Sequence, residues 1–179
     1  MRNIEWFWNM IHYILYRWIV NVNNFLDYLL PFYWINKIPA VKKHRSKNGI
    51  SDTNIFFRKM INNPKNGASI MWAGVNIGGI IVLFEISIYF LIDAFTGYNI
   101  LIKENFEKLQ FVIPIFIISI VIPYSVNYLL LFKNNKYLNY FKEFDQLSTK
   151  KRIAWGFITL FVVLLAVGSF WCSLMLIHN

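Results

Sequence analysis

The chain has 179 residues, of which 57% are hydrophobic and 19% aromatic, while only 15% are charged. A soluble domain carries about 25% charged residues, so the composition argues against a soluble fold and indicates a membrane protein. The net charge of +9 predicts contact with anionic lipid headgroups rather than with nucleic acid. Because Cys172 is the only cysteine, an intramolecular disulfide and a cysteine-based zinc site are excluded.

Residues 1–35 are predicted to form an N-terminal amphipathic helix rich in aromatic side chains, which ends at Pro31. Its apolar stripe consists of Ile4, Phe7, Ile11, Leu15, Trp18, Val22, Phe25 and Leu29, and its polar face holds Glu5, Asn9, His12, Asn23 and Asp27. This pattern is typical of a helix that lies in the membrane interface. The alternative is a bent first span packed against the others.

Residues 36–69 form a basic segment, which we expect on the cytoplasmic side. Its cations include Lys42, Lys43, Arg45 and Lys47, which are opposed only by Asp52. Next to a membrane span, such a stretch most often binds lipid headgroups or a partner. Asp52 or Thr53 is predicted to begin a short helix that ends at Ile61.

Residues 70–179 are predicted to form a three-span membrane domain with spans over 70–93, 111–132 and 153–177. Each is long enough to cross a ~30 Å hydrocarbon core. Pro114 and Pro123 predict bends in the second span. The fold class is therefore an all-α integral membrane bundle with three transmembrane helices and the N-terminal helix as a possible fourth span.

The connecting segments predict the orientation in the cell (inner) membrane. Loop 133–152 is basic, with Lys150, Lys151 and Arg152 as expected headgroup or partner contacts, and aromatic residues at helical spacing predict a second amphipathic helix there. Loop 96–110 is neutral in sum. The positive-inside rule then places the basic segments in the cytoplasm and loop 96–110 and the C-terminus outside.

Polar side chains inside the three spans fall at two matching depths. One layer is Asn76, Asn127 and Thr159, ~8 Å on the cytoplasmic side of the midplane at the helical rise, and the other is Glu85, Ser119 and Ser169, ~5 Å on the outer side. Unpaired polar groups are costly in hydrocarbon. We therefore expect each layer to pair within the bundle.

Small residues at intervals of four predict close helix packing. Gly74 and Gly78 form a GxxxG step in the first span, and Gly168 and Cys172 form a similar pair in the third. Such pairs also arise by chance in apolar helices, so this signal alone decides little.

Glu85 is the acidic residue nearest the middle of a predicted span, and the three spans contain no Lys or Arg. Burial favours the protonated carboxyl, which can donate a hydrogen bond to Ser119 or to a backbone carbonyl. Two interpretations stay open. Glu85 lines a pore or an oligomer interface, or it is a neutral acid that joins helices.

The sequence carries little that indicates catalysis. His12, His44 and His178 are scattered, which predicts no metal site, and no phosphate-binding loop or hydrolase motif is present. We therefore expect a non-enzymatic protein without a cofactor. An intramembrane enzyme or carrier is the least favoured alternative.

The function that this pattern favours is an oligomeric accessory or effector protein, of a bacterial type, that alters membrane permeability as a pore or channel. A bundle of three spans barely encloses a site, so a pore requires several copies or a larger complex. The alternative is a membrane-embedded binding module, such as an immunity protein, an adaptor, a regulatory subunit or an accessory protein of a phage-defence system.

Overall fold

The computed structural model describes residues 2–29, 38–47, 53–97 and 109–178, and each regular element in these ranges is a helix. The elements are α1 (Arg2–Leu29), α3 (Pro39–Lys47), α4 (Thr53–Ile61), α5 (Ala68–Thr96), α6 (Leu109–Asn127), a π-helix (Tyr128–Phe132), a 3-10 turn (Lys133–Asn135), α7 (Lys136–Asp145) and α8 (Thr149–His178). The predicted all-α class, with three long apolar helices and an N-terminal helix, is confirmed.

Three stretches are long and apolar enough to cross a membrane, namely Ala68–Thr96, Ile113–Asp145 and Thr149–Leu176. In their most apolar windows only 17%, 17% and 11% of the residues are buried within the chain. A soluble protein rarely exposes so much continuous apolar surface. The architecture therefore fits a multi-pass membrane protein whose outer faces are covered by lipid or by other helices.

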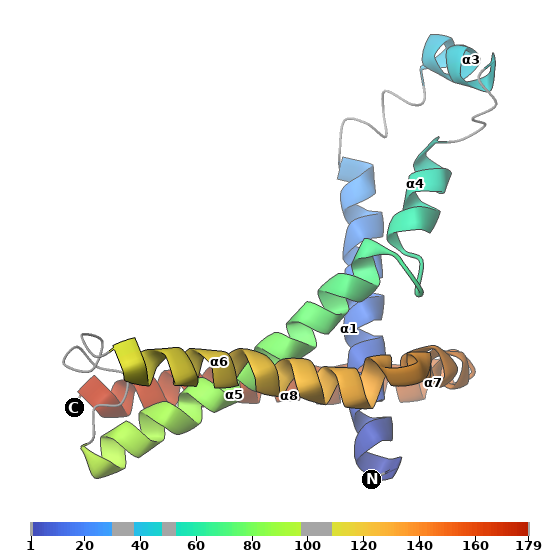
Figure 1. Ribbon diagram of the computed structural model, residues 1–179. Helices are drawn as coiled ribbons and strands as arrows, with labels where there is room; N and C mark the ends of the chain where they lie inside the picture. Colours follow the sequence, from blue (N-terminus) through green and yellow to red (C-terminus); the bar gives the residue numbers. More distant parts are fainter. Residues whose placement is uncertain (1, 30–37, 48–52, 98–108, 179) are drawn as a thin grey trace.

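The three long helices share one bundle (Figure 1). The end of α5 and the C-terminus lie at one end of the bundle, and α7 lies at the other with the start of α8. Pro114 and Pro123 both lie inside α6, which continues through them as a single helix. Asn134 and Asn135 turn the chain from the π-helix into α7, with φ angles of 59° and 53°, a left-handed conformation that asparagine tolerates better than most residues.

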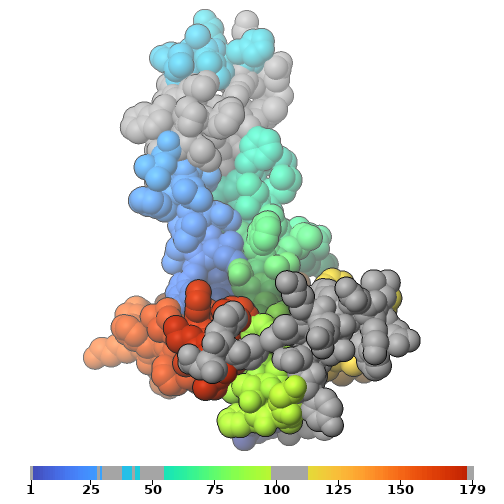
Figure 2. Space-filling view, turned by 90° about the vertical axis from the view of Figure 1, so that its left-hand side faces the viewer, coloured from blue at the N-terminus to red at the C-terminus, as the bar shows by residue number. Residues whose placement is uncertain are grey.

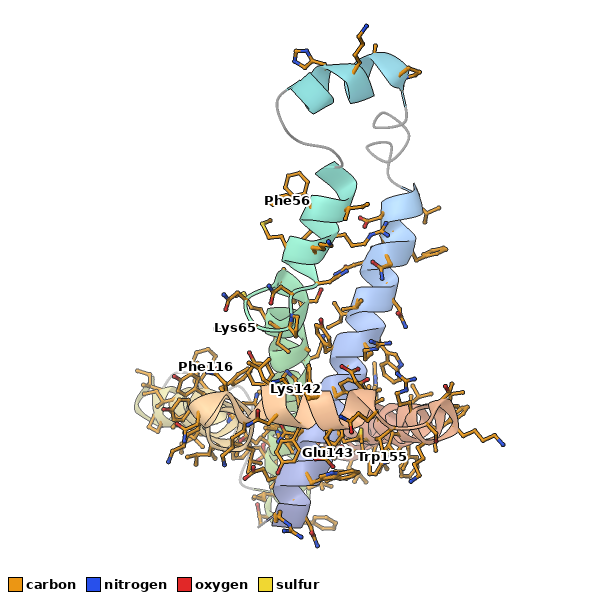
Figure 3. The ribbon with its side chains drawn as sticks, turned by 90° about the vertical axis from the view of Figure 1, so that its right-hand side faces the viewer. Phe56, Lys65, Phe116, Lys142, Glu143 and Trp155 are labelled. Carbon is orange, nitrogen blue, oxygen red and sulfur yellow. The ribbon has the colours of Figure 1, made fainter. Side chains whose placement is uncertain are left out.

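α1 crosses the direction of α6 and α8 instead of running along them (Figures 1 and 3). This placement matches a helix that lies across the ends of the spans better than a fourth span. The C-terminal half of α1 and α4 lie side by side and project from the bundle (Figure 2). The ion pair between Arg58 and Asp27, at 3.1 Å, joins these two helices.

The polar face of α1 points into the protein. Asn9 and His12 are fully buried, whereas Ile4, Phe25 and Leu29 of the apolar stripe are more than 60% exposed. A helix lying alone in the interface would turn its polar face to water. Here the other helices offer polar partners to Glu5, Asn9, Asn23 and Asp27. His12 lies among aromatic rings instead. The two ends of the apolar stripe lie outside.

α7 differs from its prediction in what it packs against. Tyr137, Phe141 and Phe144 are buried, and they contact rings on α1 rather than the membrane. The Phe141 ring lies 5.2 Å from that of Tyr13, and the Phe144 ring lies 5.3 Å from that of Trp6, both edge to face. Such ring pairs add to the burial energy, which explains why the aromatic stripe of α7 joins the core.

Candidate functional site

The polar face of α1 connects it to four other elements by direct contacts. Glu5 forms an ion pair with Lys136 of α7 at 2.9 Å. The Asn9 amide donates to the carbonyl of Leu130 in the π-helix at 2.9 Å. Further along α1, the Asn23 amide donates to Ser69 of α5 at 3.0 Å, and Asp27 pairs with Arg58 of α4. α1 is therefore the element that holds the bundle, the π-helix and α4 together.

Asn127, at the end of α6, joins α1, α5 and α6. Its Oδ1 accepts a hydrogen bond from the Trp8 indole at 3.2 Å, and its Nδ2 donates to the carbonyl of Gly74 at 3.4 Å. A Cβ on Gly78 would lie 3.3 Å from that Nδ2, and one on Gly74 would lie 3.0 Å from the Phe132 ring. The GxxxG step therefore lies on the α6-facing side of α5, where the missing side chains permit close approach.

His12 occupies the centre of α1 and is fully buried. Its ring lies 5.8 Å from Phe132, 5.8 Å from Tyr137 and 5.5 Å from Phe141. Neither ring nitrogen has a hydrogen-bond partner within the described residues. Burial lowers the pKa of His12 to about 3, which the nearby backbone of Ile70 opposes only in part. The imidazole is therefore neutral at physiological pH.

Glu85 lies two helical turns beyond Gly78 on the same side of α5. Both of its carboxylate oxygens are buried and have no hydrogen-bond partner in the part of the chain that the structure describes. Ser119, the predicted partner, makes no hydrogen bond to Glu85 among the described residues.

The described residues show no hydrogen bond between members of either predicted polar layer. Asn76 is exposed and donates to the Trp72 carbonyl of its own helix at 2.9 Å. Thr159 is fully buried, yet its hydroxyl has no partner in the described ranges. Asn127 pairs with α1 and with the backbone of α5 instead. For Asn127, α1 supplies a partner, Trp8, that a comparison of depths along the three spans does not include.

Ser169 pairs with Ser87, which the depth estimate did not select. The two hydroxyl groups share a hydrogen bond of 3.3 Å between α5 and α8.

On α8, a Cβ at Gly168 would meet nothing within 4 Å, and Cys172 is exposed. Among the described residues, Gly168 and Cys172 therefore do not form the expected close contact with another helix.

The basic residues with predicted headgroup or partner contacts lie in different places. Lys150 and Lys151 are exposed, Arg152 is half-buried at the start of α8, and Lys43 is exposed on α3. The side chains of Lys42, Arg45 and Lys47 lie outside the described residues, as does most of loop 96–110.

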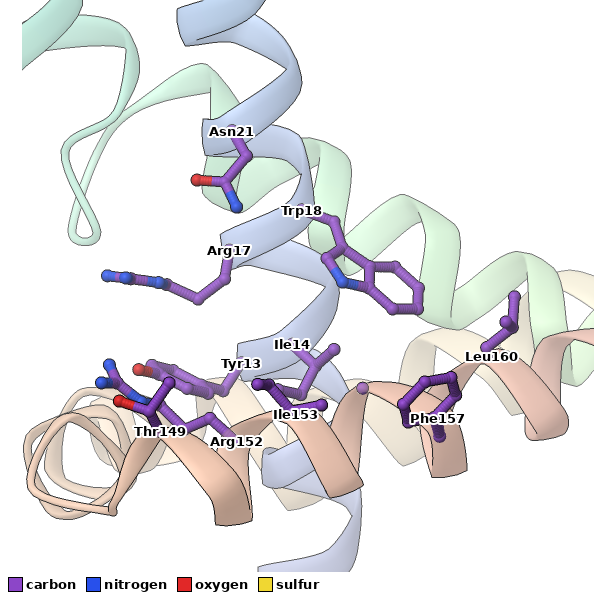
Figure 4. Close-up of a pocket in the computed structure, with 11 residues that line it drawn as sticks. Tyr13, Ile14, Arg17, Trp18, Asn21, Thr149, Arg152, Ile153, Phe157 and Leu160 are labelled. Atoms are coloured by element: carbon purple, nitrogen blue, oxygen red, sulfur yellow. The ribbon is translucent and has the colours of Figure 1, made fainter.

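A groove of about 500 Å³ lies where α1 crosses α8. Figure 4 shows Arg17 and Arg152 at one end and Phe157 and Leu160 at the other. Sequence reasoning selected Arg152 but missed Arg17 and Trp18, because residues from two distant segments form the groove. The sequence does contain one signal for this groove, which is that Arg17 lies at the border between the polar and apolar faces of α1.

The described ranges contain no group of three His, Cys, Asp or Glu side chains placed as metal ligands. No protein-family model, curated protein or solved structure matches this chain.

Proposed function

We propose that this chain is a non-enzymatic membrane protein of the cell (inner) membrane that assembles into oligomers and alters membrane permeability. In this proposal the basic segments lie in the cytoplasm, and the C-terminus lies outside. The observation that carries the proposal is the outward face of α5. One side of α5 contacts α8 and α1 and a second contacts α6, while a third remains uncovered by the described chain.

That third side combines an amide with a flat surface. Trp72 and Val75 are about 60% exposed, Asn76 is exposed beside them, and a Cβ on Gly79 would meet nothing within 4 Å. An exposed amide in hydrocarbon is costly, and a small residue one turn away lets another helix approach closely. A second copy of α5 would satisfy the amide and cover the flat surface.

Replacing Gly79 by leucine is expected to weaken this assembly about 3- to 30-fold, the range that corresponds to loss of one close polar helix contact. The copy number of the purified protein in detergent or nanodiscs, measured by light scattering or mass photometry, checks this. Gly168→Leu is the matched control, because it makes the same change at an equally open position on α8. Wild-type protein that is monomeric at every concentration would contradict the proposal.

A second expected result concerns permeability. Wild-type protein in liposomes is expected to release a small trapped dye, with a rate that rises more steeply than the protein concentration because several copies must meet. Gly79→Leu should release little, and Gly168→Leu should match the wild type. Assembly without any dye release would keep the oligomer but exclude the pore.

The second candidate function is a membrane-embedded binding module, which the surface of α4 favours. Phe56, Phe57 and Met60 are 49–61% exposed, Lys59 lies among them, and the Phe56 ring points away from α1 (Figure 3). Apolar side chains mixed with cations fit either the membrane interface or a partner protein. Absence of both assembly and dye release would leave this candidate as the favoured one.

A further inference from the structure

We propose that the groove between α1 and α8 binds one phospholipid with an anionic headgroup, whose phosphate lies against Arg17 and Arg152 and whose acyl chain follows the apolar floor. This site is independent of the α5 face that supports the proposed oligomer. Its volume of about 500 Å³ suits a headgroup phosphate and part of one acyl chain, so the rest of the lipid lies outside the groove.

The polar end of the groove favours an anion. Arg17 and Arg152 both line it, together with Thr149. The acid beside them is Asp145, which accepts a hydrogen bond from the Tyr13 hydroxyl at 2.7 Å and lies 3.9 Å from Arg17. Since both partners of that ion pair are about half exposed, it is weak. One carboxylate therefore leaves the two guanidinium groups with a net positive charge, and their planar forks suit a phosphate.

The apolar end favours a hydrocarbon chain. Ile14 and Trp18 of α1 face Ile153 and Phe157 of α8 across it, and Phe157 is 70% exposed. Gly156 leaves space between the two helices, since a Cβ there would already lie 4.0 Å from the Trp18 ring and a longer side chain would fill the groove. A soluble anion such as free phosphate would make no favourable contact with this apolar half of the groove.

The order of the two ends along α8 matches the orientation of a membrane lipid. Thr149 and Arg152 lie in the first turn of α8, at the end of the bundle where α1 crosses it, and Phe157 and Leu160 lie one to two turns further into the span (Figure 4). A phospholipid in the same leaflet places its phosphate at the helix end and its acyl chain beside the next turns. This order selects a lipid over free phosphate.

Quenching of Trp18 fluorescence by brominated acyl chains tests the proposal. The protein is reconstituted in phosphatidylcholine nanodiscs with increasing amounts of brominated phosphatidylglycerol or brominated phosphatidylcholine. In the wild type, part of the quenching is expected to need about tenfold less brominated phosphatidylglycerol than brominated phosphatidylcholine. This preference comes from the two arginines, of which Arg17 is partly neutralised by Asp145. Trp18→Phe should remove this part of the quenching, which identifies it among the seven tryptophans.

The variants separate a built site from general surface charge. Arg17→Gln with Arg152→Gln should abolish the preference. Lys133→Gln with Lys142→Gln removes the same charge from exposed side chains that do not line the groove. This control should change the preference less than about twofold, because salt screens exposed charges that lie away from the bound lipid. Gly156→Phe fills the floor without altering charge and should also abolish the preference, which covers the case in which the arginine variant fails to fold.

Three results would overturn the proposal. Equal losses in the arginine and lysine variants would mean that the whole basic surface attracts lipid. Removal of this part of the quenching by millimolar inorganic phosphate or glycerol phosphate, as readily as by unbrominated phosphatidylglycerol, would mean that the arginines hold a soluble anion. Retention of the preference in Gly156→Phe would place the acyl chain elsewhere and contradict it as well.

Discussion

Replacing Phe144 by alanine is expected to lower the free energy of unfolding by about 3–5 kcal/mol, the usual cost of removing a buried phenyl ring. Phe144 is fully buried. Its ring lies 5.3 Å from that of Trp6, 5.6 Å from that of Tyr13 and 5.8 Å from that of Tyr140. The loss arises from the cavity and from three ring contacts, of which those with Trp6 and Tyr13 attach α7 to α1 and that with Tyr140 lies within α7.

The midpoint of thermal unfolding in detergent, followed by tryptophan fluorescence, measures this effect. Phe116→Ala is the matched control, because Phe116 is 67% exposed on α6 and points away from the bundle (Figure 3). The same deletion there should change the midpoint little. If both variants unfold at the same temperature, the aromatic contacts between α1 and α7 do not stabilise the fold as described.

Lowering the pH from 7 to 5 is expected to lower the free energy of unfolding by about 2 kcal/mol through His12 alone. The pKa of His12 is lowered from 6.5 to about 3 by burial. Between these two pKa values the unfolded chain binds a proton at His12 that the folded chain does not bind. The contribution of His12 to the free energy of unfolding is therefore fully present above pH 6.5 and is lost as the pH decreases toward 3. The interval above pH 5 avoids most of the titration of the carboxylates.

The unfolding midpoint between pH 7.5 and 5 tests this linkage, with an expected decrease of about 4–8 °C for a chain of this size. His12→Leu replaces the ring with a neutral side chain and should largely remove the slope. His44→Leu, at an exposed position, should preserve it. A wild-type slope that persists in His12→Leu would show that other groups cause the acid sensitivity.

The interior of the bundle combines close helix packing with a paired amide. The GxxxG step at Gly74 and Gly78 lies against α6, because small residues let two helices pack closely. The Asn127 side chain is buried and paired, because an unpaired amide in hydrocarbon is costly. The partner of Asn127 could not be predicted, since Trp8 lies 119 residues away in the chain. Glu85 is buried as expected, while Asn76 faces outward.

The sequence by itself determined the fold class, the three spans and the short helix that ends at Ile61, because long apolar runs and helix-ending residues act locally and do not depend on distant contacts. Only the tertiary structure decided where α1 lies, that its polar face turns inward to Leu130, Ser69 and Arg58, and that Arg17 meets Arg152. An amphipathic helix can lower its free energy by turning its polar face either to water or to polar partners. The choice depends on partners that arrive from elsewhere in the chain.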